Sequence, residues 1–340
     1  KESIETDGTY SSEGSSIASD GSIKMVIGAD LRLVDSTIDA GKDLDVEVGG
    51  DLHNVRSVSE SGSAHSAYQR IDKTAGSGSR LSAGDNAEFI VKGDINNLGS
   101  EMTAGGDNKL AAGGDINIAS VETRQLDIDR SGKRKHTIEQ IRQIKAKVAA
   151  GGDLSIEADK DLTVKASDVT AAEGDLGLWI DGETKIESAQ DIDYDYRYKK
   201  KKKSFGRKTV KTTEKESLGN VESRLSAGGD LLINVKKTTE GIDRNEKSKS
   251  VSITGSDFKS GGDLMISANE NIVIRPGAEH EYYKKTKKKK GFGGLTGSSK
   301  TQIDRKERMR LSTTDSGQDT AFTAGNHVAL IAPKITGKGD

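Results

Sequence analysis

A short phrase that recurs along the whole chain constrains the fold more than any other feature. The stretch AGGDLSIEADKDLTVKAS, residues 150–167, holds two copies of it. In the first copy, Leu154, Ile156 and Ala158 alternate with polar residues, and a period of two is typical of a strand with one buried face. The Gly-Asp step before the strand indicates a turn, because Gly tolerates positive φ and the Asp side chain can bond its own backbone two residues on.

Variants of the phrase come in pairs with a constant spacing, as Asp43 with Asp51 and Asp153 with Asp161. A pair of short strands cannot bury a face alone, whereas stacked pairs bury a continuous core. Without helical crossovers between them, the strands favour an all-β fold, the parallel β-helix. We expect roughly 20 residues and two phrases per coil, and roughly eight coils stacked about 4.8 Å apart.

Composition agrees with a thin solenoid. Apolar residues make up 32% and aromatic residues 4% of the chain, which is lean for one large globular core. The net charge of −2 does not predict a nucleic-acid partner. The absence of Cys excludes disulfides and thiolate metal sites, and no apolar run is long enough for a membrane-spanning helix. Because the chain opens and closes within the repeat pattern, we expect it to be a piece of a longer protein.

Polar segments interrupt the repeats, and we interpret them as hairpins that project from a single β-helix fragment of residues 1–340. One of them, HTIEQIRQIKAKV, could be helical by propensity, but a strand is favoured because the other interruptions have the pattern of hairpins. The expected hairpins cover about residues 54–80, 121–147, 194–224, 236–259 and 276–320.

Two of these hairpins share a second pattern, in which Tyr residues precede a Lys run and a Phe-Gly pair follows it. Such a surface can meet an anionic partner such as lipopolysaccharide, acidic lipid, glycan or nucleic acid. The alternative is a solvated arm whose lysines protect an edge strand against aggregation. The candidate contact residues are Tyr194, Tyr196, Tyr198, Lys199, Lys200, Lys201, Lys202, Lys203, Phe205, Tyr282, Tyr283, Lys287, Lys288, Lys289, Lys290 and Phe292.

Catalytic, cofactor and metal sites are not expected. The five histidines show no pair at ligand spacing, and Asp193 with Asp195 in a hairpin arm makes a poor acid/base pair. Calcium at the Asp of each phrase is an alternative, but the second acceptor of the Gly/Asp-rich calcium repeats is missing. Turn capping is therefore favoured for the repeated aspartates, which include Asp115, Asp153, Asp161, Asp230 and Asp263.

Trp179 lies between Leu178 and Ile180 in one of the repeat strands. If those two side chains point inward, Trp179 points outward. It can then pack under a hairpin, or stack against a sugar.

The repeated AGGDLxIxA phrase, its AxxDLxVxA partner and the lysine-rich hairpins with Phe-Gly resemble the haemagglutinin repeats of filamentous haemagglutinin-type exoproteins. The CdiA-type effectors of contact-dependent growth inhibition are the most similar. The resemblance implies a right-handed parallel β-helix, exported to the surface of a Gram-negative bacterium by an outer-membrane transporter of the two-partner type. In those effectors this region is held in the periplasm until a receptor is engaged. It then associates with the target outer membrane and helps deliver a C-terminal toxin.

On this resemblance we expect a non-catalytic structural and interaction module of a secreted surface filament. Its expected partners are the secretion transporter and a target-cell envelope component, which could be lipopolysaccharide, lipid or an outer-membrane protein. The alternatives are a passive stalk of a filamentous adhesin and, more remotely, a carbohydrate-active enzyme on a β-helix. Unpaired strand edges at the rod ends also predict end-to-end self-association of the fragment.

Overall fold

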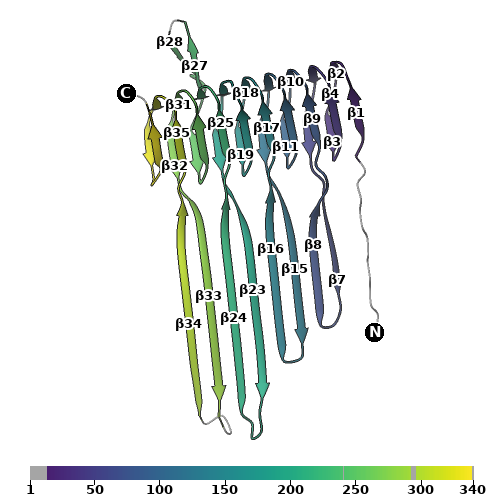
Figure 1. The fold of residues 1–340 in the computed structure, drawn as a ribbon, viewed down its shortest axis with the longest axis vertical. Helices are drawn as coiled ribbons and strands as arrows, with labels where there is room; N and C mark the ends of the chain where they lie inside the picture. Colours follow the sequence, from purple (N-terminus) through teal and green to yellow (C-terminus); the bar gives the residue numbers. More distant parts are fainter. Residues whose placement is uncertain (1–13, 240, 292–295, 339–340) are drawn as a thin grey trace.

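The chain forms a rod of stacked coils, from one side of which long hairpins extend (Figure 1). The structure, a computed structural model, describes residues 14–239, 241–291 and 296–338. Each coil contributes one strand to each of three parallel sheets, and equivalent residues of neighbouring coils lie 21 or 22 positions apart where no hairpin intervenes. The expected stack of parallel coils is confirmed. Each coil holds the expected two phrases, and it also contains a third short strand that the sequence did not predict.

That third strand belongs to the first sheet, whose strands mostly end in Ala or Ser just before the turn. In Arg80–Ala83, for example, the side chains alternate between the two faces of the strand, and those of Leu81 and Ala83 point into the core. A strand with two inward residues, one of them Ala, has too short an alternating pattern to be recognised in the sequence. The strands are β1 Ser16–Ser19, β4 Thr37–Ala40, β9 Arg80–Ala83, β12 Glu101–Ala104, β17 Lys147–Ala150, β20 Asp168–Ala171, β25 Arg224–Ala227, β30 Asp257–Ser260, β35 Thr313–Ser316 and β38 Lys334–Gly337.

The second and third sheets hold the two strands that the repeated phrase predicts. The second consists of β2 Ile23–Ile27, β5 Leu44–Val48, β10 Ala87–Val91, β13 Asn108–Ala112, β18 Leu154–Ala158, β21 Leu176–Ile180, β26 Leu231–Ile233, β31 Leu264–Ala268 and β36 Thr320–Ala324. The third consists of β3 Leu31–Val34, β6 Leu52–Val55, β11 Ile95–Leu98, β14 Ile116–Ala119, β19 Leu162–Lys165, β22 Thr184–Glu187, β29 Val251–Thr254, β32 Asn271–Arg275 and β37 His327–Leu330.

Apolar ladders along the rod axis form the core. Leu110, Ile156 and Leu178 lie directly above one another in β13, β18 and β21, and all three are buried. Burying such a side chain contributes about 1.5–3 kcal/mol, so each coil adds a few such contributions. Because the contacts run only between neighbouring coils, stability accumulates along the rod.

The Gly-Gly-Asp turns connect successive coils through the carboxylates. The Asp153 backbone N–H donates to Asp107 Oδ1 at 2.8 Å, and the Asp175 N–H donates to Asp153 Oδ1 at 2.8 Å. The side chain thus accepts from the next coil, rather than from its own turn as we expected. A Cβ on Gly152 would lie 2.2 Å from the same Asp107 oxygen, which explains the glycine before Asp153. The other predicted turn residues, Asp115, Asp161, Asp230 and Asp263, accept in the same way.

Long hairpins leave the rod between the third and first sheets, once every two coils, and they pair with one another. Among the described residues they form one eight-stranded antiparallel sheet, which we call the hairpin sheet. Two coils rise about 9.6 Å, which is also the width of two paired strands, so consecutive hairpins meet at hydrogen-bonding distance. The strands are β7 Val58–Ala64, β8 Tyr68–Ala75, β15 Val121–Ser131, β16 Arg134–Ile144, β23 Ala189–Lys202, β24 Lys208–Val221, β33 Gly277–Lys290 and β34 Gly297–Arg310.

A small hairpin, β27 Val235–Thr238 with β28 Gly241–Arg244, leaves the rod on the side away from the hairpin sheet (Figure 1). It occupies part of the expected range 236–259, but β29 and β30 in that range are rod strands, as is β35 within 276–320. Those two expected ranges are therefore too long. The HTIEQIRQI segment lies in β16 and is a strand, as favoured.

Candidate functional site: the hairpin sheet

Both faces of the hairpin sheet are open to solvent, and the register separates the candidate contact residues between them. Alternation along β23 and β33 places the tyrosines Tyr194, Tyr196, Tyr198 and Tyr282 on one side, the tyrosine face. Lys199, Lys211, Lys287 and Lys300 align on the opposite side, the lysine face.

The other predicted contact residues follow the same alternation. Lys203 and Phe205 lie beyond the end of β23, whereas Phe292 lies outside the described residues. The tyrosine face carries Lys200, Lys202, Lys288 and Lys290, and the lysine face carries Lys201, Tyr283 and Lys289.

Cross-strand contacts hold Tyr194 and Tyr196 in place. The Tyr194 hydroxyl donates to Glu214 Oε1 at 3.3 Å, and Lys135 Nζ lies 5.6 Å from the centre of the Tyr196 ring. Partial burial and the Glu214 carboxylate raise the pKa of Tyr194 to about 12, so its hydroxyl stays protonated. The tyrosine face is thus a fixed, amphipathic surface.

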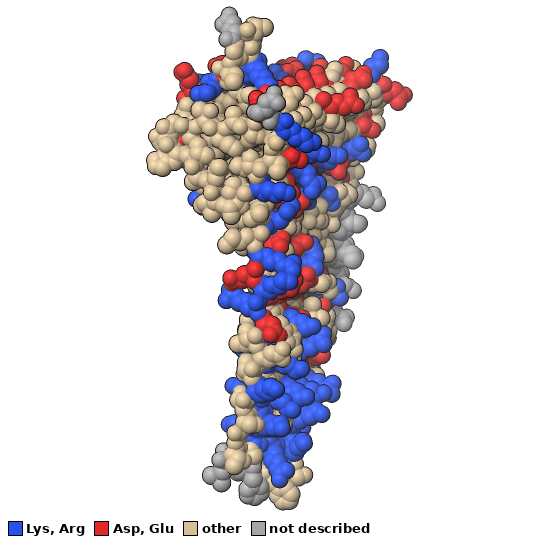
Figure 2. Space-filling view, turned by 60° about the vertical axis from the view of Figure 1, so that its left-hand side comes forward, with Lys and Arg blue, Asp and Glu red and all other residues tan. Residues whose placement is uncertain are grey.

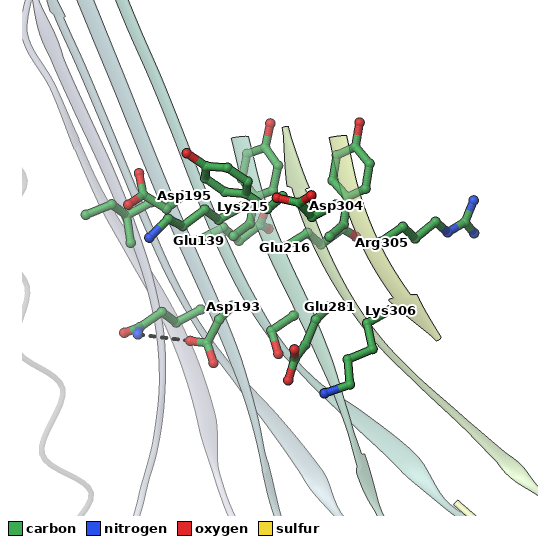
Figure 3. A pocket seen from close by; sticks show the side chains of 15 residues that line it. Glu139, Asp193, Asp195, Lys215, Glu216, Glu281, Asp304, Arg305 and Lys306 are labelled. Atoms are coloured by element: carbon green, nitrogen blue, oxygen red, sulfur yellow. Dashed lines mark hydrogen bonds between the residues drawn. The ribbon is translucent and has the colours of Figure 1, made fainter. Parts of the chain in front are cut away.

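A shallow groove of about 750 Å³ crosses the middle of the lysine face (Figure 3). Asp193 and Glu281 lie in one row of side chains, and Asp195 lies with Lys215 and Asp304 in the next.

Two of the three aspartates of this groove, Asp193 and Asp195, have side-chain partners on β16. Asp193 accepts from Arg142 at 2.5 Å, and Asp195 lies 3.0 Å from His136 Nε2, a residue that the sequence did not single out. Asp195 also pairs with Arg197, whose guanidinium nitrogen lies 2.8 Å from Asp195 Oδ2, so both aspartates are members of structural ion pairs. Among the described residues, no group of three or more His, Asp and Glu side chains could hold a metal ion.

Positive charge concentrates at the tips of the two longest hairpins (Figure 2). Residues 196–213 contain nine Lys and Arg and no Asp or Glu, and residues 282–303 contain seven and none. Within the part of the chain that the structure describes, none of the lysines in 199–203 or 287–290 lies at ion-pair distance from a carboxylate. The tips therefore carry charge that no carboxylate of the described residues neutralises.

An exposed aromatic side chain stands at the tip of the β23–β24 hairpin. Phe205 is 74% exposed, and both Phe205 and Gly206 have positive φ, of 58° and 69°. The left-handed region is costly for a residue with a Cβ, so the tight turn and not local preference sets this conformation.

The small hairpin covers Trp179 on the rod surface. Lys236 Nζ lies 4.3 Å from the centre of the Trp179 ring and 3.4 Å from Glu157 Oε1. Trp179 thus points outward and lies under a hairpin, as one of the two sequence alternatives predicts.

Lys237, the next residue, bridges Asp230 and Asp263, two of the turn aspartates that connect successive coils. Its Nζ lies 2.6 Å from Asp230 Oδ2 and 2.5 Å from Asp263 Oδ2. The ammonium group lowers the pKa of Asp263, so the stability that this ion pair contributes is present at neutral pH and is lost as the pH falls through that lowered pKa.

Replacing Lys236 by Ala is expected to expose the indole of Trp179. The chain has one Trp, so its fluorescence reports this contact alone. We expect a red-shifted emission maximum and stronger acrylamide quenching, because the side chain that covers the ring is removed. Lys92→Ala, elsewhere on the rod, serves as the control and should change neither. Identical spectra for both variants would show that the small hairpin does not cover Trp179.

Comparisons with known proteins agree with this architecture. The Hemagglutinin repeat family matches residues 58–132, 126–205 and 204–332. The chain is 25% identical over 337 residues to the tRNA nuclease CdiA of Escherichia coli (strain STEC_O31), which covers 96% of the chain and 10% of that relative. It is 26% identical over 243 residues to the 16S rRNA endonuclease CdiA of Enterobacter cloacae subsp. cloacae, which covers 66% of the chain and 7% of that relative.

The chain thus spans a tenth or less of the curated relatives it matches. The nuclease activities in their names are those of the whole relatives. No solved structure matches the chain. No helix in the described residues has the length and apolar character needed to cross a membrane.

Proposed function

The chain belongs to the family of haemagglutinin repeat proteins, and from this membership we propose that it is a non-catalytic contact module of a secreted, CdiA-like surface protein. In this proposal the rod is scaffold, and the hairpin sheet is the part that meets another cell. The basic tips contact anionic groups of the target outer membrane or envelope, and this contact helps deliver a C-terminal toxin.

The observation that carries the proposal is the acid-free positive charge at the tips of β23–β24 and β33–β34 (Figure 2). Near an anionic surface, each Lys or Arg contributes about 1 kcal/mol of attraction. Because nothing in the described part of the chain neutralises these lysines, their charge is available to a partner.

The pairing of the hairpins supports the same proposal. A separate, flexible hairpin would contact a surface independently of its neighbours. Hairpins that are paired in one sheet contact the surface with their tips at the same time. Simultaneous contacts raise the effective concentration of each further contact, so weak charge–charge interactions add up to stable attachment.

Neutralising the lysines of one tip tests the proposal. In a chain with Lys199 to Lys203 all changed to Gln, binding to outer-membrane vesicles in a sedimentation assay should weaken at least about tenfold. Raised salt should weaken wild-type binding in the same direction. The matched control changes five exposed rod lysines, Lys42, Lys92, Lys160, Lys249 and Lys259, to Gln and should retain nearly full binding. If both variants lost vesicle binding equally, the net charge of the chain, and not the position of the lysines at the tip, would determine binding.

Deleting the hairpins distinguishes this function from that of a passive stalk. The deletions remove residues 194–217 and 281–304 from the parent protein, and display on the cell surface is measured as a control. We expect lower toxin delivery with normal display. Unchanged delivery would favour the stalk instead. A carbohydrate-active enzyme has less support, because Asp193 is paired with Arg142 and Asp195 with Arg197.

A further inference from the structure

Lysines stand directly opposite one another across the strands near the hairpin tips. On the lysine face, Lys211 of β24 pairs with Lys287 of β33, and Lys287 pairs with Lys300 of β34. Lys199 of β23 continues the row on the other side of Lys211. Directly opposite side chains have Cβ atoms about 4.5–5.5 Å apart, and like charges at that separation destabilise a sheet.

The charges around this row repel one another. The ammonium groups of Lys289, Lys211 and Lys300 lower the pKa of Lys287. Within the described residues, no carboxylate lies at ion-pair distance from Lys211, Lys287 or Lys300. The sheet therefore holds positive charge together at an energetic cost, which an anion placed among the lysines would relieve.

The same lysines surround a groove with room for such an anion. Lys211, Lys287 and Lys300 form one side of it, and Thr213, Lys285 and Gln302 form the other, one row closer to the rod. Its volume is about 290 Å³, and its lining contains no Asp or Glu. Since a water molecule occupies about 30 Å³ of the liquid, the groove can hold a group the size of a diphosphate or a phosphorylated sugar.

We propose that this groove binds a terminal phosphate or diphosphate group. A phosphomonoester carries a charge of about −1.5 to −2 at pH 7 and three acceptor oxygens, which suits a site of four lysines with a hydroxyl and an amide beside them. Lys binds phosphate as a compact charge with several rotatable donors. A phosphodiester, with one negative charge, satisfies such a site less well.

The inference rests on the proposed function for the source of the ligand, because the phosphate can belong to an envelope lipid or to a soluble molecule. It goes beyond the proposed function because it assigns the contact to one groove on the lysine face. Charge at the tips alone would not distinguish the lysine face from the tyrosine face.

Calorimetric titration of the full chain with pyrophosphate tests the groove. The groove variant carries Lys285→Gln and Lys287→Gln. Its matched control carries Lys284→Gln and Lys288→Gln, which remove the same charge from the opposite face of the same strand. We expect saturable binding to wild type, a loss of at least about tenfold in the groove variant and a change of under about threefold in the control. Equal weakening in both variants, or no saturable binding to wild type, would overturn the inference.

Folding of the variants is checked by far-ultraviolet circular dichroism and heating. The Lys287→Gln change removes the charge between Lys211 and Lys300 and so relieves repulsion, and the groove variant should be at least as heat-stable as wild type. If it is less stable, the repulsion on which the inference rests is absent.

Vesicles identify the source of the phosphate. Phosphatidic acid carries a phosphomonoester and phosphatidylglycerol a phosphodiester, and the two are compared at matched surface charge. A preference for phosphatidic acid that only the groove variant loses supports a lipid-borne ligand. Pyrophosphate binding without that preference supports a soluble ligand and counts against membrane contact. Vesicle binding that both variants weaken equally keeps the proposed function and overturns the groove.

Discussion

Replacing Phe89 by Ala should lower the free energy of unfolding by about 3–5 kcal/mol. Phe89 is fully buried in β10, directly between Val46 of β5 and Leu110 of β13. Truncation removes the burial of a large ring and leaves a cavity that two rigidly stacked coils cannot close. Guanidinium chloride unfolding, followed by circular dichroism, measures the loss.

The next residue in the same strand provides the control for that experiment. Ile90 is 44% exposed and points away from the core, so Ile90→Ala should cost under about 1 kcal/mol. If both substitutions cost the same, the alternation that places Phe89 inward would be wrong. Because repeat proteins can unfold in segments, the transition is also followed through Trp179, which lies several coils away.

Replacing Gly261 by Ala should also destabilise the rod strongly, by about 2–4 kcal/mol. A Cβ at this position would lie 1.9 Å from the carbonyl oxygen of Gly228 in the preceding coil. Since that atom belongs to the backbone, a side-chain movement cannot relieve the contact, and the two coils must separate at this corner. The same unfolding measurement gives the size of the effect.

The matched substitution is Gly219→Ala in β24 of the hairpin sheet. No atom lies within 4 Å of the Cβ that it would add, so its stability should equal or slightly exceed that of wild type. A similar loss for Gly219→Ala would mean that the close approach of the coils does not account for the loss at Gly261.

Alternation in the sequence predicted two of the three rod sheets, because many of their strands follow an Asp turn and have two large inward residues. Leu154 and Ile156 in β18 are examples. The first sheet was missed because its strands have one large inward residue and then a small one, as Leu81 and Ala83 in β9. Sequence alone does not distinguish such a strand from the lead-in to a turn.

The candidate site was predictable as a set of residues but not as a surface. The Tyr, Lys and Phe-Gly pattern indicated the correct hairpins, whereas the division into two faces depends on which residues are paired. A run such as Lys287 to Lys290 contributes to both faces in turn. The position of Lys211 opposite Lys287 depends on the register between two hairpins that are joined only through the rod, and no local signal in the sequence encodes it.

The carboxylates at the rod corners give the stack a direction. The Asp94 N–H donates to Asp51 Oδ1, the Asp115 N–H to Asp94 Oδ1, and the Asp263 N–H to Asp230 Oδ1. In each case the later coil donates and the earlier coil accepts. A completed coil thus presents fixed acceptors, as well as an open strand edge, to the segment that follows it in the chain. The rod can therefore act as its own template for vectorial folding, in which each new coil is aligned by the one made before it.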